Sequence, residues 1–162
     1  MTMDIKCGIG FDAHRFDETR KLFLGGIEIP HNKGLLGHSD ADVLIHAIID
    51  SLAGPAFGKD IGMLFPDNDD KYKDIDSKIL LQRVAEMIYY DDWRISHIDA
   101  EIIAQEPKLM PYIPEMQRVL AEIMGIKTTS ITIKATTTEK MGFTGRGEGI
   151  AALASSILIK GA

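Results

Sequence analysis

The stretch GIGFDAHR, residues 8–15, places a carboxylate and an imidazole two residues apart, at Asp12 and His14. An apolar run of this kind is typical of a β-strand, in which alternate side chains share one face of the sheet. Both groups would then point the same way. They could form a surface ion pair, a catalytic pair or half of a metal site, and this segment alone leaves the three interpretations open.

A second imidazole, that of His46, lies in a segment that is apolar on nearly every side and is therefore expected to be a buried helix. Burial favours the neutral form of an imidazole, which is the form that binds metal ions. Asp42 and Asp50 lie one turn away on either side and could orient the ring. A core histidine bonded to one of these carboxylates is the alternative. With the pair described above, however, His46 completes three ligands, the usual number at a catalytic zinc ion.

Two further segments carry groups that suit phosphate. His38 and Ser39 offer an imidazole and a hydroxyl beside backbone N–H groups at a helix start, although Asp40 and Asp42 would repel phosphate unless a metal ion intervenes. A plain capping loop explains the same residues. Residues 134–149 combine threonines, a lysine, a glutamate, an arginine and several glycines, which suits a phosphate with a divalent cation. A twisted hairpin is the alternative there.

The composition sets limits on the class of protein. A length of 162 residues suits one domain spanning residues 1–162, and a formal net charge of −6 without a basic block argues against nucleic-acid binding. The single cysteine, Cys7, excludes a disulfide framework and a thiolate zinc site within the chain. No apolar run is long enough to suggest a membrane span, and we expect a cytoplasmic protein.

Strand and helix patterns alternate along the chain. This order predicts an α+β fold in two layers, a mixed β-sheet with helices packed on one face. Periodicity does not decide between strand and helix for residues 150–160. The expected strands are 3–11, 21–30 with a Gly-Gly break, 96–105 and 130–137; the expected helices are 40–53, capped by Ser39 or Asp40 and ended by Gly54-Pro55, then 76–92 and 114–124.

Five segments, in this order, resemble the 2-C-methyl-D-erythritol 2,4-cyclodiphosphate synthase family: GFDAHR, GLLGHSDADVLIHAIIDSLAG, DIGMLFPDND, IIAQEPKLMPYIP and KATTTEKMGFTGRGEGI. The resemblance covers essentially the whole chain. It implies a phosphorus–oxygen lyase of the non-mevalonate isoprenoid pathway, which converts 4-diphosphocytidyl-2-C-methyl-D-erythritol 2-phosphate into the cyclic diphosphate and releases CMP. It also implies a strand over residues 150–160 and a homotrimer built around the sheets, with active sites between subunits.

The resemblance also implies a role for each matching residue. Asp12, His14 and His46 would hold one zinc ion per subunit, and Glu139 would bind magnesium or manganese together with the substrate. His38, Thr137 and Glu139 would be catalytic, and all of these except His46 would also contact substrate. The other expected substrate contacts are Ser39, Asp60, Ile61, Gly62, Phe65, Pro66, Asp67, Asn68 and Asp69, then Ala104, Gln105, Glu106, Pro107, Lys108, Leu109 and Met110 around cytidine, and Ala135, Thr136, Thr138, Phe143 and Arg146.

Two other functions are consistent with the same residues. A metal-dependent phosphoesterase would use these ligands with water as the nucleophile. A trimeric nucleotide- or phosphate-binding module would carry a structural metal and catalyse no reaction. The identity of the metals, the trimer and the preference for cytidine rest on the resemblance.

Overall fold

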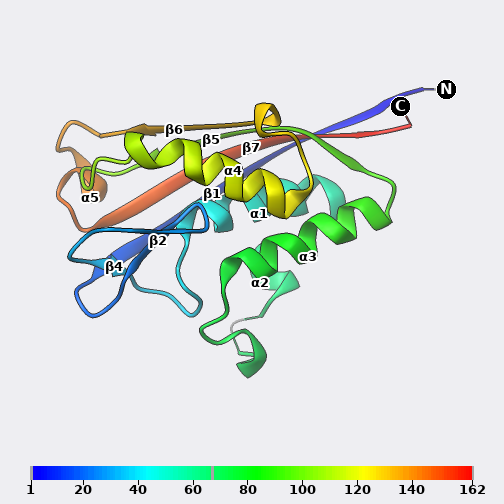
Figure 1. Ribbon diagram of the computed structural model, residues 1–162. Helices are drawn as coiled ribbons and strands as arrows, with labels where there is room; N and C mark the ends of the chain where they lie inside the picture. Colours follow the sequence, from blue (N-terminus) through cyan, green and yellow to red (C-terminus); the bar gives the residue numbers. More distant parts are fainter. Residues whose placement is uncertain (1, 67, 162) are drawn as a thin grey trace.

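The computed structural model describes residues 2–66 and 68–161, and its centre is a five-stranded sheet in the order β4-β1-β7-β5-β6 (Figure 1). Neighbouring strands are antiparallel except β5 and β6, which are parallel, so the sheet is mixed as predicted. A separate hairpin, β2 (Leu22–Leu24) and β3 (Ile27–Ile29), follows the first strand. The sheet strands are β1 (Asp4–Asp17), β4 (Gly34–Leu35), β5 (Arg94–Ile103), β6 (Ile131–Thr136) and β7 (Gly149–Lys160), the last confirming the implied strand.

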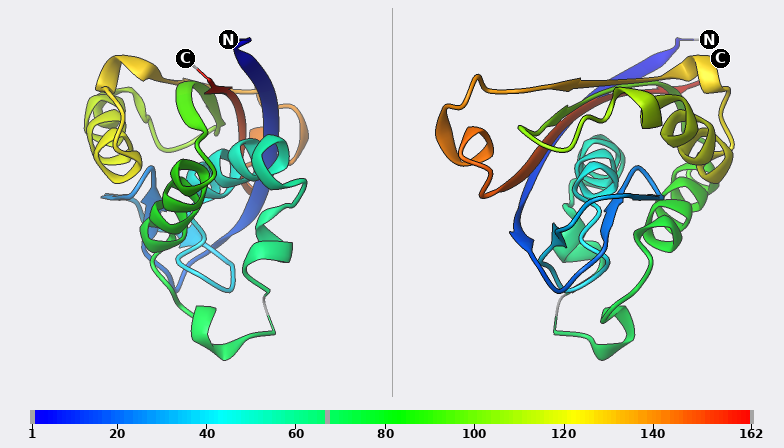
Figure 2. Two further views of the ribbon diagram at one scale, coloured as in Figure 1. Left: turned by 90° about the vertical axis from the view of Figure 1, so that its right-hand side faces the viewer. Right: turned by 60° about the vertical axis from the view of Figure 1, so that its left-hand side comes forward.

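The three long helices lie on one face of this sheet (Figures 1 and 2). They are α1 (Val43–Phe57), α3 (Ser77–Tyr90) and α4 (Ile113–Met124), and single turns form α2 (Ile61–Leu64) and α5 (Gly142–Gly145). Short 3-10 turns cover residues 70–72, 110–112 and 128–130. The two-layer α+β arrangement is therefore confirmed. In the part of the chain that the structure describes, no helix has both the length and the apolar character needed to cross a bilayer.

Helix α1 lies unusually close to strand β1. A Cβ atom added at Gly8 would lie 1.8 Å from the Ser51 carbonyl oxygen, and one added at Gly10 would lie 2.0 Å from the Ala47 carbonyl oxygen. Only residues without a side chain fit at these two positions, because the helix backbone itself rests on the strand. Contact this close determines where every other side chain of α1 meets β1.

The predicted end of this helix at Gly54-Pro55 is wrong, since α1 continues through Pro55 and closes at Gly58 in the left-handed conformation. A proline inside a helix normally leaves the carbonyl of the preceding turn without its N–H donor. Here that carbonyl belongs to Ser51, and it accepts a hydrogen bond from the Ser156 hydroxyl at 2.6 Å. The bond from β7 compensates for the missing donor, so the helix does not break.

The predicted start is also wrong, because α1 begins at Val43 and Asp42 is its N-cap. Asp42 is fully buried and accepts three backbone N–H bonds: from Ile45 and Gly25 at 3.0 Å each and from Gly26 at 2.8 Å. Burial, with the nearby Asp40, raises the pKa of Asp42 to about 6, although the three N–H donors favour the charged form. One carboxyl group thus joins the β2–β3 turn to the helix.

Replacing Gly10 by alanine should destabilise the fold by about 3 kcal/mol or more, because α1 must move off β1 to make room for the new Cβ atom. Gly54→Ala is the matched control: nothing lies within 4 Å of a Cβ atom at that helical position. Alanine there should stabilise the helix by roughly 0.5–1 kcal/mol. Denaturant unfolding of both variants checks this, and equal unfolding midpoints would contradict the proposed packing constraint.

Candidate metal centre and substrate cavities

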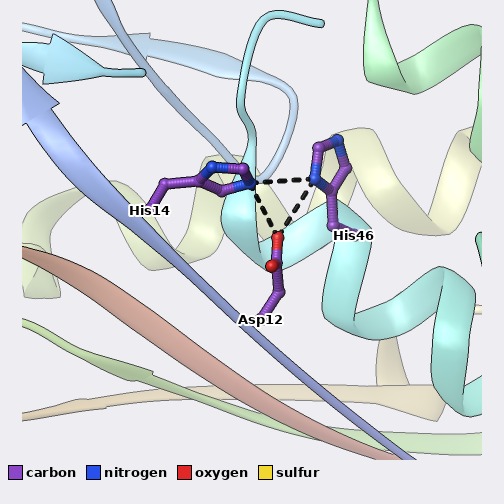
Figure 3. Close-up of side chains that lie close together, drawn as sticks. All are labelled: Asp12, His14 and His46. Carbon is purple, nitrogen blue, oxygen red and sulfur yellow. Dashed lines mark hydrogen bonds and ion pairs between the residues drawn. The ribbon is translucent and has the colours of Figure 1, made fainter. Parts of the chain in front are cut away.

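Three side chains converge on one point between β1 and α1 (Figure 3). Asp12 and His14 lie on the same face of β1, as strand alternation predicts, and His46 reaches them from the first turns of α1. The Asp12 Oδ2 atom lies 2.9 Å from His14 Nε2 and 3.1 Å from His46 Nδ1. The two ring nitrogens are 3.3 Å apart. The predicted ligand set is therefore brought together.

The nitrogen of His14 that points away from Asp12 and His46 determines the tautomer of that ring. Its Nδ1 atom lies 2.8 Å from the carbonyl oxygen of Leu36, which can only accept a hydrogen bond. Nδ1 must then carry the hydrogen, and in the neutral ring Nε2 presents its lone pair to Asp12 and His46. This is the pattern of metal-ligating histidines, whose second nitrogen donates to a carbonyl or carboxylate.

His46 is oriented in the same manner by hydroxyl groups. Its Nε2 atom lies 3.0 Å from Ser77 Oγ and 3.1 Å from Ser39 Oγ. The Ser77 hydroxyl donates to Asp40 Oδ1 at 2.5 Å, so its oxygen is left to accept the Nε2–H of His46. The inner Nδ1 atom of His46 then also offers a lone pair.

These donors suit a tetrahedral metal ion. Nitrogen and oxygen ligands bind zinc at about 2.0–2.1 Å, which places neighbouring ligand atoms about 3.3 Å from one another. The three separations of 2.9, 3.1 and 3.3 Å are close to that value, and a small outward movement of the carboxylate completes the fit. Two neutral imidazoles with one carboxylate match the chemistry of zinc and of similar divalent ions.

The same contacts act on the charges of the group. Burial alone raises the pKa of Asp12. When a proton rather than a metal ion occupies the inner ring nitrogens, the hydrogen bonds that His14 and His46 then donate outweigh burial and hold that pKa well below its usual range. Burial lowers the pKa of His14, and the hydrogen bond to Asp12 outweighs it, so the net shift is upward. Asp12 is therefore ionised and ready to bind a cation, which would compete with the proton on His14.

The two carboxylates that the sequence suggested for orienting His46 have other roles. Asp42 caps α1, and Asp50 Oδ1 accepts the Ile61 backbone N–H at 2.7 Å, which positions α2. Helical spacing indicates only the face of a residue within its own helix. It gave no sign that Ser77, 31 residues further along, would face His46.

The metal-ligating cluster forms one wall of a cavity of about 190 Å³, which we call the first cavity. The expected contacts His38, Ser39, Ile61, Gly62 and Phe65 line it together with the cluster. Sequence reasoning missed three further lining residues, which belong to an Asp-rich segment and to α3: Tyr72, Ile75 and Leu80. The rings of Phe65 and Tyr72 pack edge to face with their centroids 5.4 Å apart, and they form an apolar wall.

Other residues expected around methylerythritol take structural roles or lie beside this cavity. Asp60 caps α2 by accepting the Met63 N–H at 2.8 Å, and Asp69 accepts the Lys71 N–H at 3.2 Å. Neither residue is part of the cavity lining, nor are Pro66 and Asn68. Asp67 lies outside the described residues.

The residues expected around cytidine gather at a second cavity of about 580 Å³, past the carboxyl ends of the parallel strands β5 and β6. The end of a parallel strand pair is a common ligand position in mixed and α/β sheets. Glu106 is not part of the lining, and Pro111 is an addition that sequence reasoning missed. The second cavity is lined by Ala104, Gln105, Pro107, Lys108, Leu109, Met110, Pro111, Ala135, Thr136 and Thr137.

The loop after β6 holds its backbone in an uncommon conformation. Glu139 and Lys140 have φ angles of +53° and +66°, a region that costs a side-chain-bearing residue about 1–3 kcal/mol. The Thr137 hydroxyl oxygen accepts the Glu139 N–H at 3.2 Å, whereas the Thr138 hydroxyl donates to the Met141 carbonyl at 2.5 Å within the loop. Thr137 is thus hydrogen-bonded to Glu139 and lines the second cavity, whereas Thr138 and Glu139 are not part of either cavity lining.

Phe143 and Arg146 follow this loop and do not line either cavity. Phe143 is 40% exposed, and the Arg146 Nε–H donates to Glu148 Oε1 at 2.9 Å. Their expected contacts with substrate stay predictions.

The two cavities lie at the same end of the sheet but toward opposite edges. Ala13, beside the metal ligands, pairs with Ala151 of β7, which pairs with Ile103 of β5, which pairs with Thr136 of β6. Three strand spacings of about 4.8 Å separate the two sites by roughly 14 Å.

Comparison with known proteins agrees with this geometry. The YgbB family profile matches residues 5–159. The chain belongs to the YgbB family. A family member from Bacteroides fragilis, a 2-C-methyl-D-erythritol 2,4-cyclodiphosphate synthase, is 59% identical over 96% of this chain and 98% of its own length. The family expected from the five sequence segments is therefore confirmed.

Solved structures of YgbB relatives share the whole fold. IspF of Plasmodium falciparum in a CDP complex has a TM-score of 0.85 at 34% identity, covering 98% of this chain and 97% of that chain. The bifunctional IspDF of Campylobacter jejuni has a TM-score of 0.94 at 41% identity; the match covers 99% of this chain but 43% of that longer one. The mixed sheet with helices is thus the common YgbB architecture.

Removing the hydroxyls that hold His46 should weaken zinc binding. We expect the Ser39→Ala, Ser77→Ala double variant to bind Zn²⁺ about 10–100-fold more weakly, because the ligand ring loses both outer acceptors. Ser77→Ala alone should lose less, since Ser39 remains. Titration against a chelating dye measures the affinity, with Ser96→Ala on the exposed side of β5 as the control. An unchanged affinity in the double variant would show that these hydroxyls do not orient the ring.

Proposed function

We propose that the chain converts 4-diphosphocytidyl-2-C-methyl-D-erythritol 2-phosphate into 2-C-methyl-D-erythritol 2,4-cyclodiphosphate and CMP, in non-mevalonate isoprenoid biosynthesis. The observation that carries the proposal is the convergence of Asp12, His14 and His46 on one wall of a cavity that also presents His38 and Ser39. Membership of the YgbB family, whose compared members include cyclodiphosphate synthases, supports the same reaction.

The barrier to this reaction is mainly electrostatic. An oxygen of the 2-phosphate forms a bond to the β-phosphorus, and the bond from that phosphorus to the CMP oxygen breaks, so that CMP leaves with the electron pair. The nucleophile is already anionic near pH 7, because the second pKa of a phosphate is about 6. Two unit charges of one sign at ~4 Å cost roughly 4 kcal/mol at an effective dielectric constant of ~20. The site therefore needs positive charge and fixed geometry more than it needs a base.

Metal ions would supply that charge. Zn²⁺ held by Asp12, His14 and His46, and Mg²⁺ or Mn²⁺ held by Glu139, would neutralise phosphate oxygens when bound. The distances and ring orientations of the first site support a divalent ion there. For Glu139, support comes from its exposed carboxylate next to Thr137 in a strained loop.

The chain's own side chains would orient the phosphates. We assign His38 and Ser39 to the substrate phosphates at the first cavity, and Thr136 and Thr137 to phosphate at the second cavity. Lys108, in the lining of the second cavity, offers a cation there. The remaining expected contacts with methylerythritol and cytidine are proposed on the same basis, including Asp60, Asp67, Phe143 and Arg146.

The apolar wall of the first cavity favours cyclisation over hydrolysis. Phe65 and Tyr72 are 7% and 9% exposed and stand edge to face, with Ile61 and Leu80 beside them. A wall of this kind restricts the access of water to the reacting phosphorus, so the internal phosphate has the advantage as nucleophile. This observation favours the synthase over a phosphoesterase with the same ligands.

We further propose that the chain forms a homotrimer with active sites between subunits. The sheet face away from the helices carries a row of exposed apolar side chains on β1 and β7, since Gly8 and Gly10 of β1 face α1 and alternate residues point to the other side: Ile5, Ile9, Phe11, Leu153 and Ile157. Pairing of Phe11 with Leu153 and of Cys7 with Ile157 makes the surface continuous, and such patches mark interfaces. A cyclic assembly joins unlike surfaces of neighbours, so the first cavity of one copy could meet the second cavity of the next.

The reaction is tested directly by its products. The protein, incubated with the diphosphocytidyl substrate, should release CMP and the cyclic diphosphate, followed by phosphorus NMR, and a chelator should stop turnover. His46→Ala should lose both metal and turnover while it stays folded, with His31→Ala as the control. Release of inorganic phosphate would favour the phosphoesterase. Substrate binding without turnover would favour the binding module, and full activity of His46→Ala would refute the metal assignment.

The trimer predicts a specific response to charge on the exposed sheet face. Ile9, 72% exposed, should be buried in the assembly, so Ile9→Glu should lower the mass in solution from a trimer toward a monomer. The control is Tyr90→Glu, which changes a residue of α3 that is 89% exposed. Sedimentation velocity measures both variants. A trimer that survives Ile9→Glu unchanged would place the interface elsewhere.

A further inference from the structure

The loop of residues 36–39 holds both histidine ligands from outside the metal centre. The Leu36 carbonyl accepts the His14 Nδ1–H, and the Ser39 hydroxyl lies within hydrogen-bond distance of His46 Nε2. The backbone at Gly37 also packs on the His14 ring, since a Cβ atom there would lie 3.1 Å from its Cε1 atom. The position of this one loop therefore decides the orientation of two ligand rings.

Arg20 holds that loop through two of its backbone carbonyls. Its Nη1 atom donates to the Gly37 carbonyl at 2.6 Å and its Nη2 atom to the Ser39 carbonyl at 2.5 Å. The two carbonyls flank His38, so the planar guanidinium spans the residue that faces the first cavity. Arg20 makes no ion pair with any carboxylate of the described residues, which leaves its donors committed to the loop.

The chain leads Arg20 to this place through a defined turn. Strand β1 ends at Asp17, whose Oδ1 atom accepts both the N–H of Thr19, at 2.7 Å, and its hydroxyl, at 2.5 Å. This local pattern reverses the chain just before Arg20. The turn and the Arg20 guanidinium together connect the end of β1, which carries the ligands Asp12 and His14, to loop 36–39, which orients the ligand rings.

We propose that Arg20 is a positioning residue of the metal centre: by holding the carbonyls of Gly37 and Ser39 it keeps loop 36–39 in place against the two ligand rings. The inference rests on the proposed function, because it takes the cluster to be a metal site. A lysine could reach one carbonyl but not both, since its ammonium is a point donor without the rigid fork of arginine.

The test compares Arg20→Gln and Arg20→Lys with Lys21→Gln. Lys21 is the matched control, because its loss removes the same charge one residue away, where its ammonium pairs, among the described residues, with the exposed Glu28. Zn²⁺ affinity is measured with a chelating dye for all three variants. We expect a loss of about 10–100-fold for Arg20→Gln, a smaller loss for Arg20→Lys and none for Lys21→Gln.

A second readout needs no metal. In the metal-free protein, the Nδ1–H signal of His14 should be visible by nitrogen–proton NMR, because it is held by the Leu36 carbonyl. It should broaden or shift in both Arg20 variants and stay unchanged in Lys21→Gln, a response that a general loss of stability would not give. In turnover, Arg20→Lys should lower kcat more than it raises KM.

The outcomes separate this inference from the proposed function. If the wild-type protein binds Zn²⁺ and both Arg20 variants match Lys21→Gln in affinity and in the His14 signal, the role of Arg20 is refuted while the function stands. If the wild-type protein binds no Zn²⁺, both ideas fall. Should Arg20→Gln not fold, Arg20→Lys decides by the same two measurements.

Discussion

The candidate site depends on the contact between α1 and β1, where two glycines let the helix backbone rest on the strand. His46 precedes Ala47, whose carbonyl lies against Gly10, and the ligand Asp12 follows two residues later on the same face of the strand. A larger residue at Gly10 would push the helix outward and with it His46. Because ligand atoms must approach within about 3.3 Å of one another, even a shift of about 1 Å would separate the ligand set.

At the end of the sheet where the two cavities lie, its two edges carry different groups. The metal ligands lie near the β4–β1 edge, and the second cavity lies at β6, the opposite edge. A symmetric dimer that pairs identical edges would not bring the metal ligands of one copy to the second cavity of another. A ring that joins the β4–β1 edge of one copy to the β6 edge of the next does so at every interface. The apolar face between them, around Phe11 and Leu153, gives such a ring a surface to bury. The proposed division of the active site between subunits and the proposed trimer would thus have one structural cause.

The sequence predicts the features that follow from periodicity, namely the strands, the helices and the faces of their residues. It misses the features that depend on contacts between distant segments. Alternation placed Asp12 and His14 on one face and found β5 and β6 almost to their ends. It could not show that His46 meets them, since that depends on how closely the helix approaches Gly8 and Gly10. Pro55 looked like a helix end because the Ser156 hydroxyl that compensates for the missing donor lies 105 residues along the chain from Ser51, whose carbonyl it contacts. The cavity residues Tyr72 and Leu80 were missed for the same reason, because only the folded chain brings them to the ligands.

An acidic protein can hold a polyanion if the carboxylates near its site are already committed to other partners. Asp42 accepts three backbone N–H groups, Asp50 one, and Asp40 both the N–H and the hydroxyl of Ser77. Each of these bonds directs positive partial charge at the carboxylate and reduces its repulsion of a nearby phosphate. The sequence raised that repulsion as an objection to phosphate at His38. The structure answers it, because these acidic groups hold α1, α2 and α3 in place around the cavity, while Asp12 faces the two histidine rings.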